Sequence, residues 1–515
     1  MGEAKTPQAP ALKPVSQALA EVLSCLETPG GRLQVRWDAG AAVTPFGQMA
    51  YFIEFLNLTG LLDAWIADCP LTYLSPNAPT QRDLLGTWLL SILAGHRRYA
   101  HATSIRSDGV NPGLLGMRKV VSEDALRRGL AKIPEAEGVT WLRGHLERSV
   151  LPLLKAPWIL DVDTTVKQLY GKQEGAVAGY NPKKPGRPSH TYHTYLVAGL
   201  RLVLDAEVLA GNESNSSHTL PGLTRLLDRL AEAARPPYLV RGDCGFGNDP
   251  VMRQMEERGQ PYLFKLRLTA GVRRYIEKRF SSGVWSDAGA GWEGLDGELR
   301  LSGWERDRRV VVLRRRLQGE VLLAGEAQGQ QVLAFLEEEG PVQRYEYAVR
   351  VTSLAHEIRA VAQLYRDRGD GENSFDELKN QWGWGGFATQ DLHRCQLTAR
   401  AVALAYNWWS LFVRLANPKA RLEAITSRPL LLGGIAEKTR HARQERLTIT
   451  PVHGKGGQAR AMLEKVSALL QGWKRDAEQL RLKTVWEAVC DHLITILTRF
   501  DWLTPRLGTP SPAPS

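Results

Sequence analysis

The sequence predicts a multidomain α/β protein in which helical regions stand on either side of an α/β core. Residues 41–155 and 421–515 contain amphipathic segments with apolar residues at helical spacing. Residues 156–269 alternate between strand-like and helix-like segments, and residues 270–353 form a strand-rich stretch divided by Gly-rich turns. The chain has 515 residues, of which 43% are hydrophobic, so it is long enough for several domains.

The N-terminal 155 residues fall into two parts. Residues 1–40 begin with a Pro- and Ala-rich stretch and are predicted to be poorly ordered. Residues 41–155 carry three amphipathic segments, the first capped by Thr44 and the third by Ser122. A short basic helix after a loop is typical of a helical DNA-binding domain, and an ordinary helical bundle has the same pattern. Both interpretations stay open from the pattern alone.

Residues 156–269 and 354–420 are predicted to be the two parts of one α/β core. A strand at WILDVD is followed by a β-hairpin over residues 192–213, an amphipathic helix, and then strand, helix and strand. This order is expected of a ribonuclease-H-like core. The stretch 270–353 then interrupts the core as a β-rich insertion, and the near-continuous apolar pattern of residues 397–415 predicts a buried helix.

A charged motif stands in the second part of the core: Tyr365, Arg368, Glu372 and Lys379 have the spacing Y-x2-R-x3-E-x6-K. On one continuous helix these spacings would place all four side chains within roughly 60° of one another. Carboxylates bind divalent metal ions, whereas Arg and Lys bind phosphate oxygens, so this face suits chemistry on a polyanion. A solvated charged face fits the spacing equally well. Asp376 falls on the same face and is the rival to Glu372.

The motif resembles the YREK signature of bacterial insertion-sequence transposases of the DDE class, and the resemblance extends over residues 158–414. It implies that Glu372 is the third catalytic carboxylate. It also implies that Arg368 and Lys379 hold phosphates near the transposon end, and that Tyr365 contacts the DNA backbone. The implied function is a DNA transposase that binds terminal inverted repeats, cleaves the transposon ends by metal-dependent hydrolysis and joins the 3′-hydroxyls to target DNA.

Two further carboxylates are needed, because such chemistry uses carboxylates from separate elements to hold two divalent cations. Asp161 and Asp163 share one face of the strand WILDVD, and the residues alone do not choose between them. The Asp-Thr-Thr that begins at Asp163 resembles the first catalytic block of the family, and Asp243 after YLVRG resembles the second. Asp243 could instead cap a strand-to-helix turn. The resemblance implies two Mg²⁺ (or Mn²⁺) ions per active site, bound by Asp163, Asp243 and Glu372.

Other residues are predicted to contact DNA. Three basic residues stand in a Gly- and Pro-rich segment that resembles one subgroup of the family: Lys183, Lys184 and Arg187. They are predicted to form a backbone-contact loop, and a solvated loop fits equally well. Three tryptophans of the insertion stand near arginines: Trp285, Trp292 and Trp304. One of them is a candidate for stacking on an unpaired base, against the alternative that all three are core residues.

The charge balance agrees with a nucleic-acid partner. The net charge is +11 and the pI about 9.4, and residues 421–515 contain 15 Lys and Arg against 9 Asp and Glu before a tail predicted to be disordered. We expect double-stranded DNA as partner, both inverted repeats and target, and a homodimer on it. The five scattered cysteines contain no CxxC pair and no signal peptide or membrane span is evident, which predicts a cytoplasmic, nucleoid-associated protein. The alternatives are a ribonuclease-H-like nuclease without joining activity and a transposase-derived DNA-binding regulator.

Overall fold

The computed structural model describes residues 24–38, 40–155, 157–181, 184–281, 283–317, 332–334, 344–387, 389–480 and 483–499. The chain divides into two compact units, residues 1–42 and 43–515.

The first unit contains a β-hairpin. Strands β1 (Ser24–Thr28) and β2 (Gly31–Val35) pair antiparallel, and Gly31 at φ 115° completes the tight turn between them. The prediction that residues 1–40 are poorly ordered is therefore wrong for this hairpin. Residues 1–23 lie outside the described part of the chain.

The second unit begins with a helical layer. Its main helices are α1 (Met49–Leu58), α2 (Leu61–Ala67), α3 (Gln81–Leu93), α5 (Glu123–Leu130) and α6 (Glu135–Val150). The Ser122 cap is confirmed, because its hydroxyl accepts the Ala125 N–H at the start of α5. Thr44 is not a cap: it ends strand β3 (Ala42–Thr44), and its hydroxyl donates to Asp108. Gly60, at φ 67°, separates α1 from α2 within the segment that was predicted as one helix.

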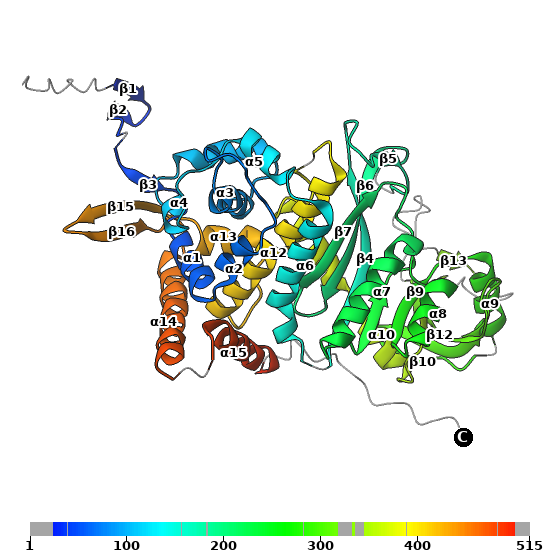
Figure 1. The fold of residues 1–515 in the computed structure, drawn as a ribbon. Helices are drawn as coiled ribbons and strands as arrows, with labels where there is room; N and C mark the ends of the chain where they lie inside the picture. Colours follow the sequence, from blue (N-terminus) through cyan, green and yellow to red (C-terminus); the bar gives the residue numbers. More distant parts are fainter. Residues whose placement is uncertain are drawn as a thin grey trace, which may run out of the picture. The chain divides into compact units, whose positions relative to one another are not determined.

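An eleven-stranded sheet forms the centre of this unit (Figure 1). The strands of the expected core are β4 (Ile159–Gln168), β5 (Val177–Ala178), β6 (Pro188–Val197), β7 (Leu202–Ala210), β8 (Leu239–Gly242) and β9 (Tyr262–Leu266). β4, β6 and β7 form an antiparallel meander, which confirms the predicted hairpin as β6–β7. β8 then pairs parallel with β4, and β9 pairs parallel with β8. The connections are helices α7 (Ser216–Glu232) and α8 (Asp249–Glu257).

The strands of the expected insertion belong to the same sheet. They are β10 (Ser286–Gly289), β11 (Trp292–Leu299), β12 (Arg308–Arg316), β13 (Val332–Ala334) and β14 (Arg344–Thr352), after helix α9 (Ala270–Phe280). β14 pairs antiparallel with β9, so the sheet runs β10-β11-β12-β14-β9-β8-β4-β6 without interruption. The insertion thus extends the core sheet.

Three helices follow the insertion: α10 (Ile358–Arg366), α11 (Gly369–Asn380) and α12 (Leu392–Ala416). The charged motif is divided between α10 and α11, so the prediction of one continuous helical face is wrong. Gly369 and Gly371 lower the helix propensity at the junction, which allows the chain to turn there. α12 is buried almost throughout, as predicted, and lies beside α6 against β7 (Figure 1).

The C-terminal region is helical only in part. A hairpin of β15 (Ile435–His441) and β16 (Gln444–Thr450) stands between helix α13 (Ala424–Leu431) and helix α14 (Gly456–Leu480), and helix α15 (Val485–Arg499) follows α14. Ala442 and Arg443 have positive φ, which is the conformation of a two-residue hairpin turn. The predicted disordered tail, residues 500–515, lies outside the described residues. Within the described ranges, no helix is both long and apolar enough to cross a membrane.

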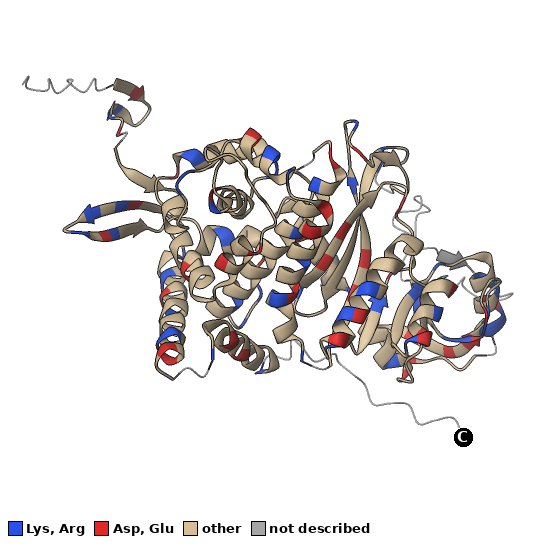
Figure 2. Cartoon of the chain, in the orientation of Figure 1, with Lys and Arg blue, Asp and Glu red and all other residues tan. Residues whose placement is uncertain are grey.

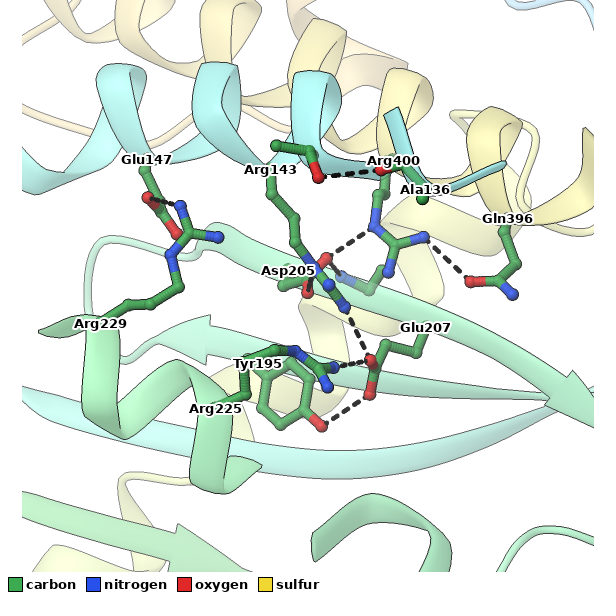
Figure 3. A network of polar contacts seen from close by, with 12 residues as sticks. Ala136, Arg143, Glu147, Tyr195, Asp205, Glu207, Arg225, Arg229, Gln396 and Arg400 are labelled. Atoms are coloured by element: carbon green, nitrogen blue, oxygen red, sulfur yellow. Dashed lines mark hydrogen bonds and ion pairs between the residues drawn. The ribbon is translucent and has the colours of Figure 1, made fainter. Parts of the chain in front are cut away.

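A buried ion-pair network ties α6 and α12 to the sheet (Figure 3). Asp205 on β7 accepts from Arg143 Nε of α6 at 2.6 Å and from Arg400 Nε of α12 at 2.8 Å. Glu207, two residues along β7, accepts from Arg143 Nη2 at 2.7 Å and from the Tyr195 hydroxyl at 3.1 Å. Burial alone would raise the pKa of Asp205, but the two guanidinium groups outweigh it and hold this pKa below its ordinary value.

Candidate active site

The parallel register of β4 and β8 places two predicted carboxylates side by side. Asp161 lies beside Arg241, and Val162 lies beside Gly242. Asp163 and Asp243 are the residues that follow this last registered pair, and Asp243 comes directly after the end of β8 at Gly242. Neighbouring strands lie about 4.8 Å apart and registered residues of parallel strands point to one face, so a continued register would place the two carboxylates on the same face. Both carboxylates act electrostatically on Arg368.

Each of these carboxylates is held by a short contact. Asp163 Oδ2 lies 3.1 Å from Arg368 Nη2, and Asp243 Oδ1 accepts the Gly245 N–H at 2.8 Å. Arg368 is buried at the start of α11. Its burial would lower the pKa of the guanidinium, but Asp163 raises this pKa above its ordinary value. The ion pair therefore fixes the start of α11 over β4.

The other members of the motif lie on both sides of that junction. Tyr365 is in the last turn of α10, where the Arg350 guanidinium stands 3.8 Å from the centre of its ring and burial raises its pKa. Lys379 is in the last turn of α11. Glu372 belongs to α11, and its side chain lies outside the described part of the structure. Asp376, the rival acid, is exposed and accepts from Asn380 Nδ2 at 2.6 Å.

A cavity of about 950 Å³ opens beside Asp243. β4 continues to Gln168 whereas β8 ends at Gly242, and this step in the sheet exposes the second half of β4 to the cavity. Its lining includes three basic side chains, Lys167, Arg267 and Lys379. A basic cavity next to paired carboxylates suits a phosphodiester substrate.

The predicted backbone-contact loop reaches the same cavity. Tyr170, which lines it and is 71% exposed, carries Lys184 Nζ at 5.6 Å and the Arg187 guanidinium at 4.9 Å from its ring centre. The structure thus brings two of the three predicted loop residues together. Lys183 lies outside the described residues.

The carboxylates fit a divalent cation in their chemistry. Asp163 and Asp243 offer oxygen donors from adjacent strands, which Mg²⁺ and Mn²⁺ prefer. Among the side chains that the structure describes, no group of three His, Cys, Asp or Glu stands close enough to hold a metal ion. A third acid would therefore have to come from a side chain that the structure does not describe, and Glu372 is one of these.

Residues 73–470, more than half of the chain, match the protein family described as Transposase DDE domain group 1. The chain belongs to this family. Among solved structures, it is similar to the cryo-EM structure of a piggyBac transposase synaptic complex with hairpin DNA. That similarity has 10% sequence identity and a TM-score of 0.36, and covers 92% of this chain and 87% of that chain. No curated protein matches the chain.

The sequence patterns did not single out two arginines of this DDE domain, Arg241 and Arg350. Both are buried, Arg241 against Asp161 and Arg350 against Tyr365. For Arg241, the sequence offered one signal of a buried partner, because this arginine is a charged residue inside the otherwise apolar strand YLVRG. Basic and acidic residues are interspersed over helices and strands alike (Figure 2), so overall charge does not single these positions out.

The three tryptophans of the insertion are packed against arginines. Each has an arginine over its ring: Arg314 at 3.9 Å for Trp285, Arg315 at 5.0 Å for Trp292 and Arg308 at 5.3 Å for Trp304. Trp304 is buried and the other two are half-buried. None of the three is among the described residues that line the cavity beside Asp243. The stacking role stays a prediction.

Lys167 gives the DDE domain a testable pH dependence. Its ammonium is buried against the Tyr192 hydroxyl and the Gly386 carbonyl, and burial lowers its pKa from 10.5 to about 8. Between these values the unfolded chain holds a proton that the folded chain has released, so the free energy of unfolding rises with pH. We expect this rise to be smaller in Lys167→Met by roughly 3 kcal/mol between pH 8 and 10.5, at 1.36 kcal/mol per unit. Urea unfolding of wild type and Lys167→Met at a series of pH values measures the difference. An equal rise of the free energy of unfolding with pH in both proteins would contradict the prediction.

Proposed function

We propose that this protein is a DNA transposase that binds terminal inverted repeats, cleaves the transposon ends by metal-dependent hydrolysis and joins the freed 3′-hydroxyls to target DNA. The observation that carries the proposal is the register of β4 and β8, which pairs Val162 with Gly242, so that Asp163 and Asp243 are the next residues on either side. Asp163 also contacts Arg368 at the start of α11. Membership of the transposase family supports it.

The catalytic core is proposed to be ribonuclease-H-like. Support comes from the strand order β7-β6-β4-β8-β9, in which three antiparallel strands are followed by two strands parallel to the first. In such a core the sheet carries two acids, and a helix packed on it carries the third. α11, which contains Glu372, meets the sheet through the contact of Arg368 with Asp163.

Asp163, Asp243 and Glu372 would hold Mg²⁺ or Mn²⁺, two ions per active site. The bound cations would supply activation of the attacking water or 3′-hydroxyl and stabilisation of the leaving oxygen. Arg368 would keep Asp163 in place beside them. To bind a DNA phosphate, Arg368 would have to contact the phosphate in addition to Asp163, or give up its contact with Asp163.

DNA would run along the basic cavity. Lys379 and Tyr365 would contact its backbone near the cut, and Lys183, Lys184 and Arg187 would contact it further away. The helical region 41–155 and the basic region 421–515 would recognise the inverted repeats and assemble a homodimer across two ends. The protein would act in the bacterial cytoplasm, on nucleoid DNA.

The test uses the DNA that flanks the gene. Short inverted repeats that bracket the gene would be built into a labelled duplex. This duplex would be incubated with the protein, Mg²⁺ and a supercoiled target plasmid. We expect cleavage at the repeat ends and labelled DNA joined to the plasmid. Cleavage without joined product would indicate a nuclease, and specific binding without cleavage would indicate a DNA-binding regulator.

Lys379 provides a measurement of backbone contact. Because it lines the cavity near Asp243, Lys379→Ala is expected to reduce cleavage. It should also make the log–log dependence of end binding on salt shallower by about one unit. Lys419→Ala removes an exposed lysine outside the cavity lining and is the matched control. An unchanged salt slope together with full cleavage by Lys379→Ala would support the solvated-face interpretation instead.

A further inference from the structure

One step below the proposed metal-binding carboxylates, β4 and β8 carry a second registered pair, Asp161 and Arg241. Arg241 donates from Nε to Asp161 Oδ1 at 2.7 Å and from Nη2 to Asp161 Oδ2 at 2.8 Å. Both side chains are buried, with 1% exposure for Arg241 and 3% for Asp161. Each stands two residues before Asp163 or Asp243, so the ion pair and the carboxylates share one face of the sheet.

The same guanidinium also holds the helices above the sheet. Arg241 Nη1 donates to the carbonyl oxygen of Leu364 in α10, the helix that leads into the motif. A Cβ atom on Gly371, in the first turn of α11, would lie 3.7 Å from Asp161 Oδ2, so α11 begins within van der Waals distance of the ion pair. The three elements that carry the proposed acids therefore meet at one buried ion pair.

We propose that the Asp161–Arg241 ion pair is the positioning device of the metal site. It sets the separation of Asp163 and Asp243, and it sets the height of α11 above them. Neither residue touches metal or substrate, and both act through their neighbours. The inference rests on the proposed function, because it assumes that these carboxylates hold the metal.

The chemistry of the two side chains explains why they suit this role. A guanidinium has donors on three nitrogens in a rigid plane, so Arg241 makes the paired bond to Asp161 from two of them and the bond to Leu364 from the third. An ammonium must donate from a single nitrogen and cannot reproduce this geometry. The charge of Asp161 is compensated within the protein, so cations are left to Asp163. Residues that orient metal ligands in this way typically contribute about 10- to 100-fold to metal affinity or activity.

The experiment separates positioning from stability. Removing one partner would leave a buried charge unpaired and could unfold the protein, whereas replacing both with apolar residues of similar size is often tolerated. The double variant Asp161→Leu, Arg241→Met is therefore compared with wild type for urea unfolding, end binding, Mn²⁺ binding by calorimetry and cleavage. We expect normal end binding, Mn²⁺ affinity reduced about 10- to 100-fold, and a lowered kcat at unchanged KM for DNA.

A second variant keeps the proposal testable if the double variant fails to fold. Arg241→Lys retains the charge but not the three-bond fork, and the same loss of Mn²⁺ affinity is expected. Wild-type Mn²⁺ affinity in whichever variant folds would overturn the inference. So would loss of Mn²⁺ binding in the double variant but not in Asp163→Ala, because Asp161 would then be the ligand. Wild-type protein that neither binds Mn²⁺ nor cleaves would instead refute the proposed function.

Discussion

Alanine at Asp163, Asp243 or Glu372 is expected to abolish cleavage of the transposon ends while specific end binding stays near the wild-type level. Metal-assisted catalysis supplies several kcal/mol of transition-state stabilisation, so the rate should fall by about a thousandfold or more. Binding should persist, because it depends on phosphate and base contacts elsewhere on the protein. A gel assay that follows bound and cleaved end DNA in the same reactions measures both effects.

Two further variants locate the acids. Asp376→Ala removes an exposed carboxylate from the same helix as Glu372 and is the matched control, with full activity expected. Loss of cleavage in Asp376→Ala but not in Glu372→Ala would show that the third acid is misassigned. Normal cleavage by Asp163→Ala would refute the first assignment in the same way, because the register argument for Asp163 would fail.

Asp205→Asn is expected to cause the largest loss of stability. The change leaves the buried guanidinium of Arg400 and the half-buried one of Arg143 without the carboxylate charge of Asp205, and removing one partner of a buried ion pair costs about 3–5 kcal/mol. Urea unfolding should show the loss as a lower midpoint. The control is Asp228→Asn, which breaks an exposed ion pair with Arg258 and should leave the midpoint unchanged.

The pH dependence of the stability difference between wild type and Asp205→Asn tests whether the lost charge is its cause. The pKa of Asp205 is lowered in the folded protein, so its contribution to stability is complete above the unfolded pKa, about 3.9. It is lost as the pH falls through the folded value. The free-energy difference between wild type and Asp205→Asn should therefore shrink in acid. A difference that is constant down to pH 2 would attribute the loss to packing rather than to charge.

Local patterns in the sequence predicted those elements whose side chains divide between core and solvent in a regular way. The β6–β7 hairpin is rich in β-branched and aromatic residues, and the apolar run of α12 predicted a buried helix; both are confirmed. The pairing of β4 with β8 could not be predicted from spacing. It depends on the sheet, which brings Asp161 to Arg241 across 80 residues of chain.

Elements without such a division were missed. The β15–β16 hairpin is exposed on most of both faces, so no apolar alternation marks it, and its turn residues Ala442 and Arg443 are not typical turn formers. The break between α10 and α11 was also missed, because the Y-x2-R-x3-E-x6-K spacing fits an ideal helix. There the bonds of Leu364 and Arg368 to the sheet fix two helices separately.

The seam between β9 and β14 limits how far this protein could be shortened. Four of the five residues of β9 are buried, and β14 covers the side of β9 that faces away from β8. Without residues 270–353, the backbone N–H and C=O groups on that side would have no partner, and an uncovered hydrophobic edge of this kind recruits strands from other molecules. β14 thus covers this edge of the sheet, and we expect a shortened chain that lacks residues 270–353 to self-associate through β9.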